Sequence, residues 1–448
     1  MKHFLLFLLV LSATVHAQVA TDTTKFSCRT TPPSAKELHH RLSLDFNKTL
    51  PDILPYIEKY YPNADSNQIA KWERSGALEC IEIDGEKRYF RNAAANLFRI
   101  DPDARRVKET VDGRERASRD YIVSLHIRQV LASKKNKNHL YLPHHWLFNY
   151  NITLRNTPDL TTGTPISLWL PYPSDQVARQ ADIRIENANR TYSLSDSTPH
   201  SSAYTTLTYH PDSANCAAIA YRFTTHAEYH PLPRHFKHRK ADITDPRLKK
   251  HLRLGSRHCT PSPEILKITH QIVGDETRPY YQARRLFAAL RQLYPWASAR
   301  EYSTIADIPQ YVIENRHGDC GQITLLYMLM CNIVDIPARW QSGFMLHPGY
   351  ENLHDWCEIY IEGMGWIPID PSFGVQQWGT TDEERYFYFG GIDAYRLIIN
   401  TDYASPLAPL KLHPRSEPID FQRGEVETAT QNLYFDSWSW AMNSTPFP

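Results

Sequence analysis

Residues 318–344 of the 448-residue chain read GDCGQITLLYMLMCNIVDIPARWQSGF. In this stretch Cys320 stands between short polar or glycine residues and a long apolar run. Because the run is apolar nearly all round, it predicts a buried helix that begins at Cys320. This position alone leaves three roles open for Cys320: a structural thiol, half of a disulfide, or a nucleophile.

A cysteine at a helix start has the chemistry of a nucleophile. The unpaired backbone N–H groups and the positive end of the helix dipole favour a thiolate, so we expect a lowered thiol pKa. The same N–H groups suit an oxyanion formed when sulfur attacks a carbonyl. Cys331 lies three helical turns further on, about 16 Å along the axis, which is beyond disulfide reach. We therefore expect Cys331 to fill the core.

A nucleophilic thiol needs a base, and the base needs an orienting group. Residues 352–374, NLHDWCEIYIEGMGWIPIDPSFG, alternate like a strand, turn at glycines and return as a second strand. His354 lies on the first strand and Asp370 at the end of the second. Taken singly, each of these signals is weak; together they predict a nucleophile, a base and an orienter.

The register of this hairpin decides whether His354 and Asp370 meet. Pairing Glu358 with Trp366 also places His354 opposite Asp370, and we favour this register. A turn centred on Met364 would instead bring Asp370 opposite Glu358.

The motifs Gly-Asp-Cys-Gly, Ile-Pro-Ala-Arg, His-x-Trp-x-Glu and Gly-Trp-x-Pro-x-Asp resemble those of the transglutaminase-like superfamily. The resemblance is close over residues 312–374 and extends over 261–400. It implies a papain-like core in which Cys320 is the nucleophile, His354 the base and later the acid, and Asp370 the orienter.

The resemblance also raises two questions. Relatives often carry a second oxyanion donor upstream, for which Trp296 and Tyr302 are both candidates. Asp355 follows His354 where many relatives have a small residue, and strand alternation predicts that it points away from the site. There is no clustered acidic loop of the kind that binds calcium in animal transglutaminases, so calcium activation is not implied.

The N-terminus has the pattern of a secretory signal peptide. Residues 1–17 contain Lys2, an apolar stretch over 4–15 and a small-residue site that predicts cleavage after Ala17. The apolar stretch is shorter than the roughly 20 residues that span a bilayer. We expect a secreted or periplasmic protein without stable membrane insertion; a retained anchor is the alternative.

The composition excludes several classes of function. Lys and Arg number 50 against 49 Asp and Glu, so the overall charge does not predict a nucleic-acid partner. Zinc, phosphate-loop and Cys-x2-Cys motifs are missing, and we expect no cofactor or metal. Among seven cysteines, Cys28 with Cys80, or Cys216 with Cys259, could bridge, although sequence does not fix connectivity.

The pattern along the chain predicts a multi-domain α+β protein. Capped helical segments come first, then short alternating strands typical of an antiparallel β-sandwich, then the papain-like, transglutaminase-like core. The expected divisions are a signal peptide (1–17), a mainly helical region (18–135), a β-sandwich (140–235), the catalytic core (255–400) and a C-terminal tail with a closing strand (401–448).

These observations predict an exported cysteine-dependent enzyme that works through a thioester on Cys320 and hydrolyses an amide bond of a peptide or protein. Transfer of the acyl group to an amine, as in a transglutaminase, is the first alternative. The second is a non-catalytic binding protein that uses the β-sandwich and the aromatic tail.

Overall fold

The computed structural model describes residues 32–113, 118–133, 139–158, 160–253, 256 and 258–447. The expected signal peptide and Cys28 lie outside the described residues. Within the described ranges, no helix combines the length and apolar character needed to cross a bilayer.

The first part of the chain is helical, as its capping residues predict. Asp65, for example, accepts a hydrogen bond from the Gln68 amide at 2.8 Å and starts α4. Helices α2–α6 and one hairpin close around Trp72, Phe90 and Phe98. The elements are α2 Ala35–Asp45, α3 Leu50–Glu58, α4 Ser66–Arg74, β1 Cys80–Ile83, β2 Glu86–Tyr89, α5 Ala93–Ile100, α6 Pro102–Asp112 and α7 Ser118–Ala132. Helix α7 packs instead with the core of the C-terminal half, through Val123, Ile127 and others.

Two antiparallel sheets share the second hydrophobic core, to which Trp146, Leu168 and Val426 contribute. One sheet has the order β12-β8-β3-β16, with β5 also paired to β8, and the other has the order β15-β14-β4-β7-β6. The last part of the chain therefore completes both sheets, and β16 pairs with β3 along its whole length. The strands are β3 Leu140–Leu154, β4 Pro165–Pro171, β5 Gln180–Ala188, β6 Ser193–Ser195, β7 Ser202–Thr208, β8 Cys216–Tyr229, β12 Gly391–Ile392, β14 Glu425–Thr428, β15 Asn432–Leu433 and β16 Trp438–Phe447.

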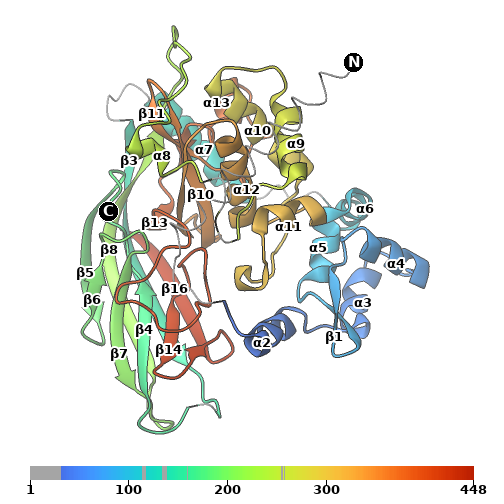
Figure 1. Ribbon diagram of the computed structural model, residues 1–448, viewed down its shortest axis with the longest axis vertical. Coiled ribbons are helices and arrows are strands. Elements are labelled where there is room, and N and C mark those ends of the chain that lie inside the picture. The colour runs from blue at the N-terminus through green and yellow to red at the C-terminus, as the bar shows by residue number, and fades with distance from the viewer. Residues whose placement is uncertain are drawn as a thin grey trace, which may run out of the picture.

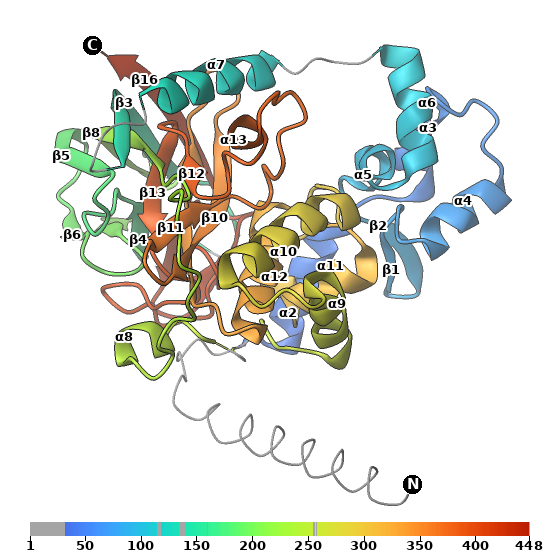
Figure 2. The same cartoon turned by 90° about the horizontal axis from the view of Figure 1, so that it is seen from above.

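The third part places helices against a four-stranded antiparallel sheet of order β11-β10-β9-β13. In Figure 1 this part lies between the long strands of the sandwich and helices α3–α6, and Figure 2 shows the same arrangement from above. The fold is thus mixed α+β, as predicted. The elements are α8 Pro246–Lys249, α9 Pro263–Val273, α10 Pro279–Leu293, η1 Tyr302–Thr304, α11 Ile308–Asn315, α12 Cys320–Ile333, β9 Ala338–Met345, β10 Asn352–Ile361, β11 Gly365–Ile369, α13 Asp382–Arg385 and β13 Arg396–Asn400.

Helix α12 confirms the prediction of a buried helix that begins at Cys320. It begins at Cys320, and its residues 321–332 are buried. The Asp319 carboxylate accepts a hydrogen bond from the Gln322 amide at 3.0 Å, and the Gln322 side chain accepts one from the Asp319 amide at 3.3 Å. This reciprocal capping box fixes the helix start, and with it the position of Cys320.

The hairpin of β10 and β11 corrects the sequence prediction, because both registers considered there are wrong. Glu358 pairs with Pro368, and the turn centres on Gly363, whose φ of 88° suits glycine. The observed register lies two residues from either alternative. Since side chains alternate with period 2, a shift of two keeps Asp370 on the face of His354. The two residues become diagonal neighbours, which long side chains can still bridge.

The cysteines are free thiols wherever the structure describes them. Cys216 and Cys259 do not form a disulfide, so that pairing is wrong. Cys80 is also free, and its considered partner Cys28 lies outside the described residues. Cys331 is fully buried, as expected for a residue that fills the core.

Candidate active site

A large cavity of about 1920 Å³ lies where three parts of the chain meet. Its lining includes Cys320 at the start of α12, His354 and Asp355 near the start of β10, and Asp420 from the loop before β14. Helices α5 and α6 supply another part of the wall, through Phe98 and other residues. The N-terminal helical region therefore forms part of the cavity wall.

His354 and Asp370 meet in the structure. The His354 Nε2 atom lies 2.7 Å from Asp370 Oδ2, and both side chains are buried. Burial lowers the pKa of His354 against the attraction of Asp370, so the ring is neutral at rest. With Nε2 directed to Asp370, Nδ1 is the ring nitrogen left for proton exchange with a reacting group.

The carboxylate of Asp370 is held on all sides. Its Oδ2 atom also accepts from the Arg396 guanidinium at 2.8 Å, while Oδ1 accepts from the Ser372 hydroxyl and the Phe373 amide, both at 2.9 Å. Although burial opposes the charged form, His354 and Arg396 together hold the pKa of Asp370 below its ordinary value. Asp370 therefore stays ionised and orients the imidazole.

Arg396 is a site residue that the sequence reasoning missed. It is fully buried and bridges Asp370 to Asp393, whose Oδ2 atom it contacts at 2.8 Å. His347 and Tyr388 also reach Asp393, at 3.3 Å and 2.8 Å. Residues 395–399 have an ordinary strand pattern and match no catalytic motif. Only the fold therefore reveals that Arg396 bridges the two carboxylates.

Asp355 lies beside Cys320, which corrects the prediction that it points away from the site. The Cys320 thiol donates to Asp355 Oδ2 at 3.3 Å. Helix α12 packs on the face of β10 that carries Asp355, and His354 extends from the opposite face into the same cavity. Asp355 and His354 thus lie on opposite faces of β10, as alternation predicts, but the start of α12 brings Cys320 to the face of Asp355.

The resting thiol also differs from expectation. Burial, and then the carboxylates of Asp355 and Asp319, raise the pKa of Cys320 well above its ordinary value. The helix dipole was expected to lower this pKa. In the folded chain two nearby carboxylates and desolvation outweigh the dipole. At neutral pH the resting group is therefore a thiol, and it must lose its proton during any reaction.

Of the two candidate oxyanion donors, Tyr302 is the better placed. Its hydroxyl donates to Asp319 Oδ1 at 2.6 Å, at the start of α12. A Cβ atom on Gly321 would lie only 2.3 Å from this hydroxyl, so glycine is needed there. Trp296 also lines the cavity, but it is 42% exposed and lies against the Arg99 guanidinium.

Comparisons with known proteins find similarity in the segment that contains these residues. The model of the transglutaminase-like superfamily matches residues 266–371, a segment that includes Cys320, His354 and Asp370. An uncharacterized protein of Bacillus subtilis, YebA, is 25% identical over 81 residues, which are 15% of this chain and 11% of that protein. The matched segment thus spans a small part of this relative.

Two solved structures also match over much of their length. A provisionally assigned cysteine protease from Cytophaga hutchinsonii has a TM-score of 0.41 and 15% identity, over 69% of this chain and 89% of that one. The periplasmic domain of TgpA from Pseudomonas aeruginosa has a TM-score of 0.28 and 15% identity, over 50% of this chain and 88% of that one. On the match of the family model, residues 266–371 are a transglutaminase-like core domain.

Proposed function

We propose that this protein is an exported cysteine-dependent enzyme that hydrolyses an amide bond of a peptide or protein. Cys320 is the nucleophile, His354 the base and acid, and Asp370 the orienter. The observation that carries the proposal is the 2.7 Å contact between His354 Nε2 and Asp370 Oδ2, at the wall of the cavity that Cys320 also lines.

In the first half of the reaction, the Cys320 sulfur attacks the amide carbonyl carbon while His354 Nδ1 takes the thiol proton. The resulting imidazolium is stabilised by ionised Asp370. The carbon–nitrogen bond then breaks, and His354 returns the proton to the departing amine. A thioester on Cys320 remains.

In the second half, water attacks the thioester and His354 accepts a proton from it. The carbon–sulfur bond breaks, the carboxylic acid leaves, and the proton returns to sulfur. The charged oxygen of both tetrahedral intermediates is held by backbone N–H groups at the start of α12, with the Tyr302 hydroxyl as second donor. Tyr302 must then turn from Asp319 toward the intermediate.

Amine transfer from the same thioester is the second candidate. Asp355, which accepts from the Cys320 thiol, and Asp420 both line the cavity, and such carboxyl groups, when ionised, attract a protonated amine. Water is present far above any amine, so transfer requires a site that excludes it. We rank hydrolysis first for this reason.

One experiment separates these activities. The purified protein and its Cys320→Ala variant are incubated with casein or cell-wall peptides and a tagged primary amine, and products are read by mass spectrometry. Cleavage that needs Cys320 supports a peptidase, ammonia release alone an amidase, and tag incorporation a transglutaminase. Identical products from both proteins would contradict the proposal.

Export rests on the N-terminal sequence pattern and is tested separately. A chain expressed with residues 1–17 should be recovered outside the cytoplasm with Gln18 as its first residue. Recovery in the cytoplasm with Met1 retained would contradict export.

A further inference from the structure

The oxyanion donor Tyr302 lies on a short loop between α10 and α11. Residues 297–304, all of which the structure describes, contain as regular structure only the three-residue turn η1, which begins at Tyr302. A loop of this kind does not fix a side chain by itself. An oxyanion donor, however, must lie within about 2.7–3.1 Å of the charged oxygen. Other parts of the chain must therefore hold the loop.

Two buried side chains of the N-terminal helical region hold the backbone of this loop. Asn96 of α5 accepts from the Ser298 amide at 3.0 Å and donates to the Ser298 carbonyl oxygen at 2.8 Å. Asp45 of α2 accepts from the Glu301 amide at 2.8 Å. Asn96 is 2% exposed, and Asp45 is fully buried. Because an unpaired buried polar group is costly, each side chain fixes the part of the loop that it contacts.

Glu301, the residue before Tyr302, is fixed a second time through its carboxylate. Arg91, between β2 and α5, donates to Glu301 at 3.0 Å and also to Asp45. Arg423 binds the same carboxylate at 3.0 Å and 2.6 Å. Although burial opposes the charged form, Arg423 and then Arg91 lower the pKa of Glu301 to about 2, so these ion pairs are present at neutral pH.

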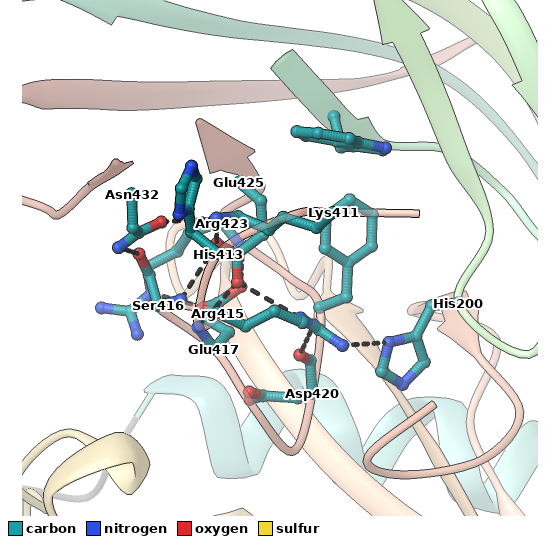
Figure 3. A network of polar contacts seen from close by, with 12 residues as sticks. His200, Lys411, His413, Arg415, Ser416, Glu417, Asp420, Arg423, Glu425 and Asn432 are labelled. Carbon is teal, nitrogen blue, oxygen red and sulfur yellow. Dashed lines mark hydrogen bonds and ion pairs between the residues drawn. The ribbon is translucent and has the colours of Figure 1, made fainter. Parts of the chain in front are cut away.

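The loop before β14 holds Arg423 in turn. Glu417 accepts from the Gln422 and Arg423 amides at 2.8 Å and 2.9 Å, and from Arg423 Nε at 2.5 Å. Figure 3 shows Glu417 and Arg423 in the polar network of this loop. The segment that carries Tyr302 is therefore held by both the N-terminal helical region and the C-terminal part of the chain.

The Tyr302 hydroxyl is suited to the role of a donor, and its position leaves little room for error. Burial, and then the carboxyl group of Asp319, raise the pKa of Tyr302 well above its ordinary value, so the hydroxyl keeps its proton. The hydroxyl lies only 2.3 Å from the position that a Cβ atom on Gly321 would take. A shift of the loop by about 1 Å would move the donor out of hydrogen-bond distance of an oxyanion at the start of α12.

We propose that Asp45 and Asn96 are positioning residues for Tyr302, and that the N-terminal helical region thereby completes the oxyanion site. Both residues lie outside the segment that the family model matches, 266–371. The inference rests on the proposed function, because it takes Tyr302 as the second oxyanion donor. The helical region then contributes to the rate of the chemical step as well as to the cavity wall.

A double-mutant cycle tests whether the two residues act through Tyr302. Asp45→Asn has one acceptor oxygen for the two donors that Asp45 binds, and Asn96→Leu removes both bonds to Ser298. Each variant should lower kcat about tenfold and change KM less than about twofold, with a peptide from the cleavage experiment. In the Tyr302→Phe background the same substitutions should lower kcat less than about twofold, because the donor that they position is absent.

The control variant is Glu73→Gln. Glu73 accepts from Lys87 at 2.8 Å and also from Tyr89, so this variant perturbs the helical region away from the loop. It should leave kcat within about twofold of the wild type. If the buried variants do not fold, Arg91→Lys takes their place in the cycle. It keeps the charge of a side chain that is 35% exposed but loses the fork that joins two carboxylates.

Hydrogen exchange of the peptide that contains residues 298–305, read by mass spectrometry, tests the hold on the loop without turnover. Asp45→Asn and Asn96→Leu should speed this exchange at least about tenfold, and Glu73→Gln should leave it unchanged. Unchanged exchange in the first two variants would overturn the inference whether or not the protein is active.

The kinetic outcomes separate the remaining possibilities. Equal losses of kcat with and without the Tyr302 hydroxyl would mean that the helical region does not act through this donor. A change in KM alone would assign the region to substrate binding, and unchanged kinetics would also overturn the inference. Absence of any Cys320-dependent cleavage would sink the proposed function and this inference with it, whereas failure of the cycle in an active enzyme would sink the inference alone.

Discussion

The two faces of strand β10 differ in how their charged groups are paired. On the face of His354, the charges of Asp370, Arg396 and Asp393 are paired in an unbroken buried network. On the face of Asp355, the Cys320 thiol lies beside the carboxyl groups of Asp355 and Asp319, whose hydrogen-bond donors in the described part of the chain are uncharged. Both faces reach one cavity.

The difference indicates which part of the site is complete. The paired face holds the imidazole in one tautomer and orientation before any substrate arrives, which is the preorganisation that general acid–base catalysis needs. On the other face, burial and the carboxyl groups of Asp355 and Asp319 keep the sulfur protonated, so the thiol needs a base before it can react.

The largest effect is expected where the paired face orients His354. Asp370→Asn should lower amide hydrolysis by about a thousandfold or more, because an amide does not hold the imidazole in the required tautomer. The measurement is kcat with a peptide identified in the cleavage experiment. Asp393→Asn removes the other carboxylate at Arg396 and is the matched control. Equal losses in both variants would contradict the orienting role of Asp370.

The second prediction concerns the stability of the paired face. Arg396→Met should reduce the free energy of unfolding by about 3–5 kcal/mol, because Asp370 and Asp393 are left buried without their counterion. Urea unfolding measures the change. The control is Arg284→Met, whose partner Asp382 is 73% exposed, and there the loss should stay below about 1 kcal/mol. Similar losses in the two variants would show that the buried ion pairs contribute no more to the free energy of unfolding than an exposed one.

The third prediction concerns the oxyanion donor on the face of Cys320. Tyr302→Phe should lower kcat by about a hundredfold, the usual cost of removing one such donor. The Trp296→Phe variant is the comparison, and it should stay within about twofold of the wild type because its ring lies against Arg99. The reverse order of effects would assign the donor to Trp296.

The fourth prediction concerns His317, which is buried before α12 and whose two ring nitrogens have no hydrogen-bond partner among the residues that the structure describes. Burial lowers the pKa of this histidine from 6.5 to about 4. Between these values the unfolded chain binds a proton that the folded chain does not, so stability falls as the pH drops through this window. The wild type should therefore lose about 2 kcal/mol more of its free energy of unfolding between pH 7 and pH 5 than the His317→Leu variant, which has no titrating ring at this position. Parallel pH dependences in urea unfolding would contradict the assignment.

Local patterns in the sequence predict a good part of this site. The apolar run after Cys320 predicts the buried helix and its start, because period and capping are local properties. The alternation of side chains along the two strands places His354 and Asp370 on one face. This prediction holds even though the predicted register is wrong by two residues, because a shift of two leaves every side chain on its face.

The remainder depends on long-range packing. Which face of β10 meets α12 decides the role of Asp355, and alternation alone leaves both faces equivalent. Arg396 and Asp420 come from distant segments without a motif, so only the folded chain brings them to the site. The thiol pKa was predicted from the helix dipole alone. Of the two carboxylates that reverse it, Asp319 is the preceding residue in the chain, whereas Asp355 reaches Cys320 only through the packing of α12 on β10.

The most direct test of the whole account is the rate of Cys320 alkylation by iodoacetamide from pH 5 to pH 10, in the wild type and in His354→Ala. If His354 takes the thiol proton, the wild type should react at least about tenfold faster at pH 7. The two curves should converge at high pH, where the thiol ionises without help. Superimposed curves over the whole range would show that sulfur and imidazole do not act together, and would contradict the proposed enzyme.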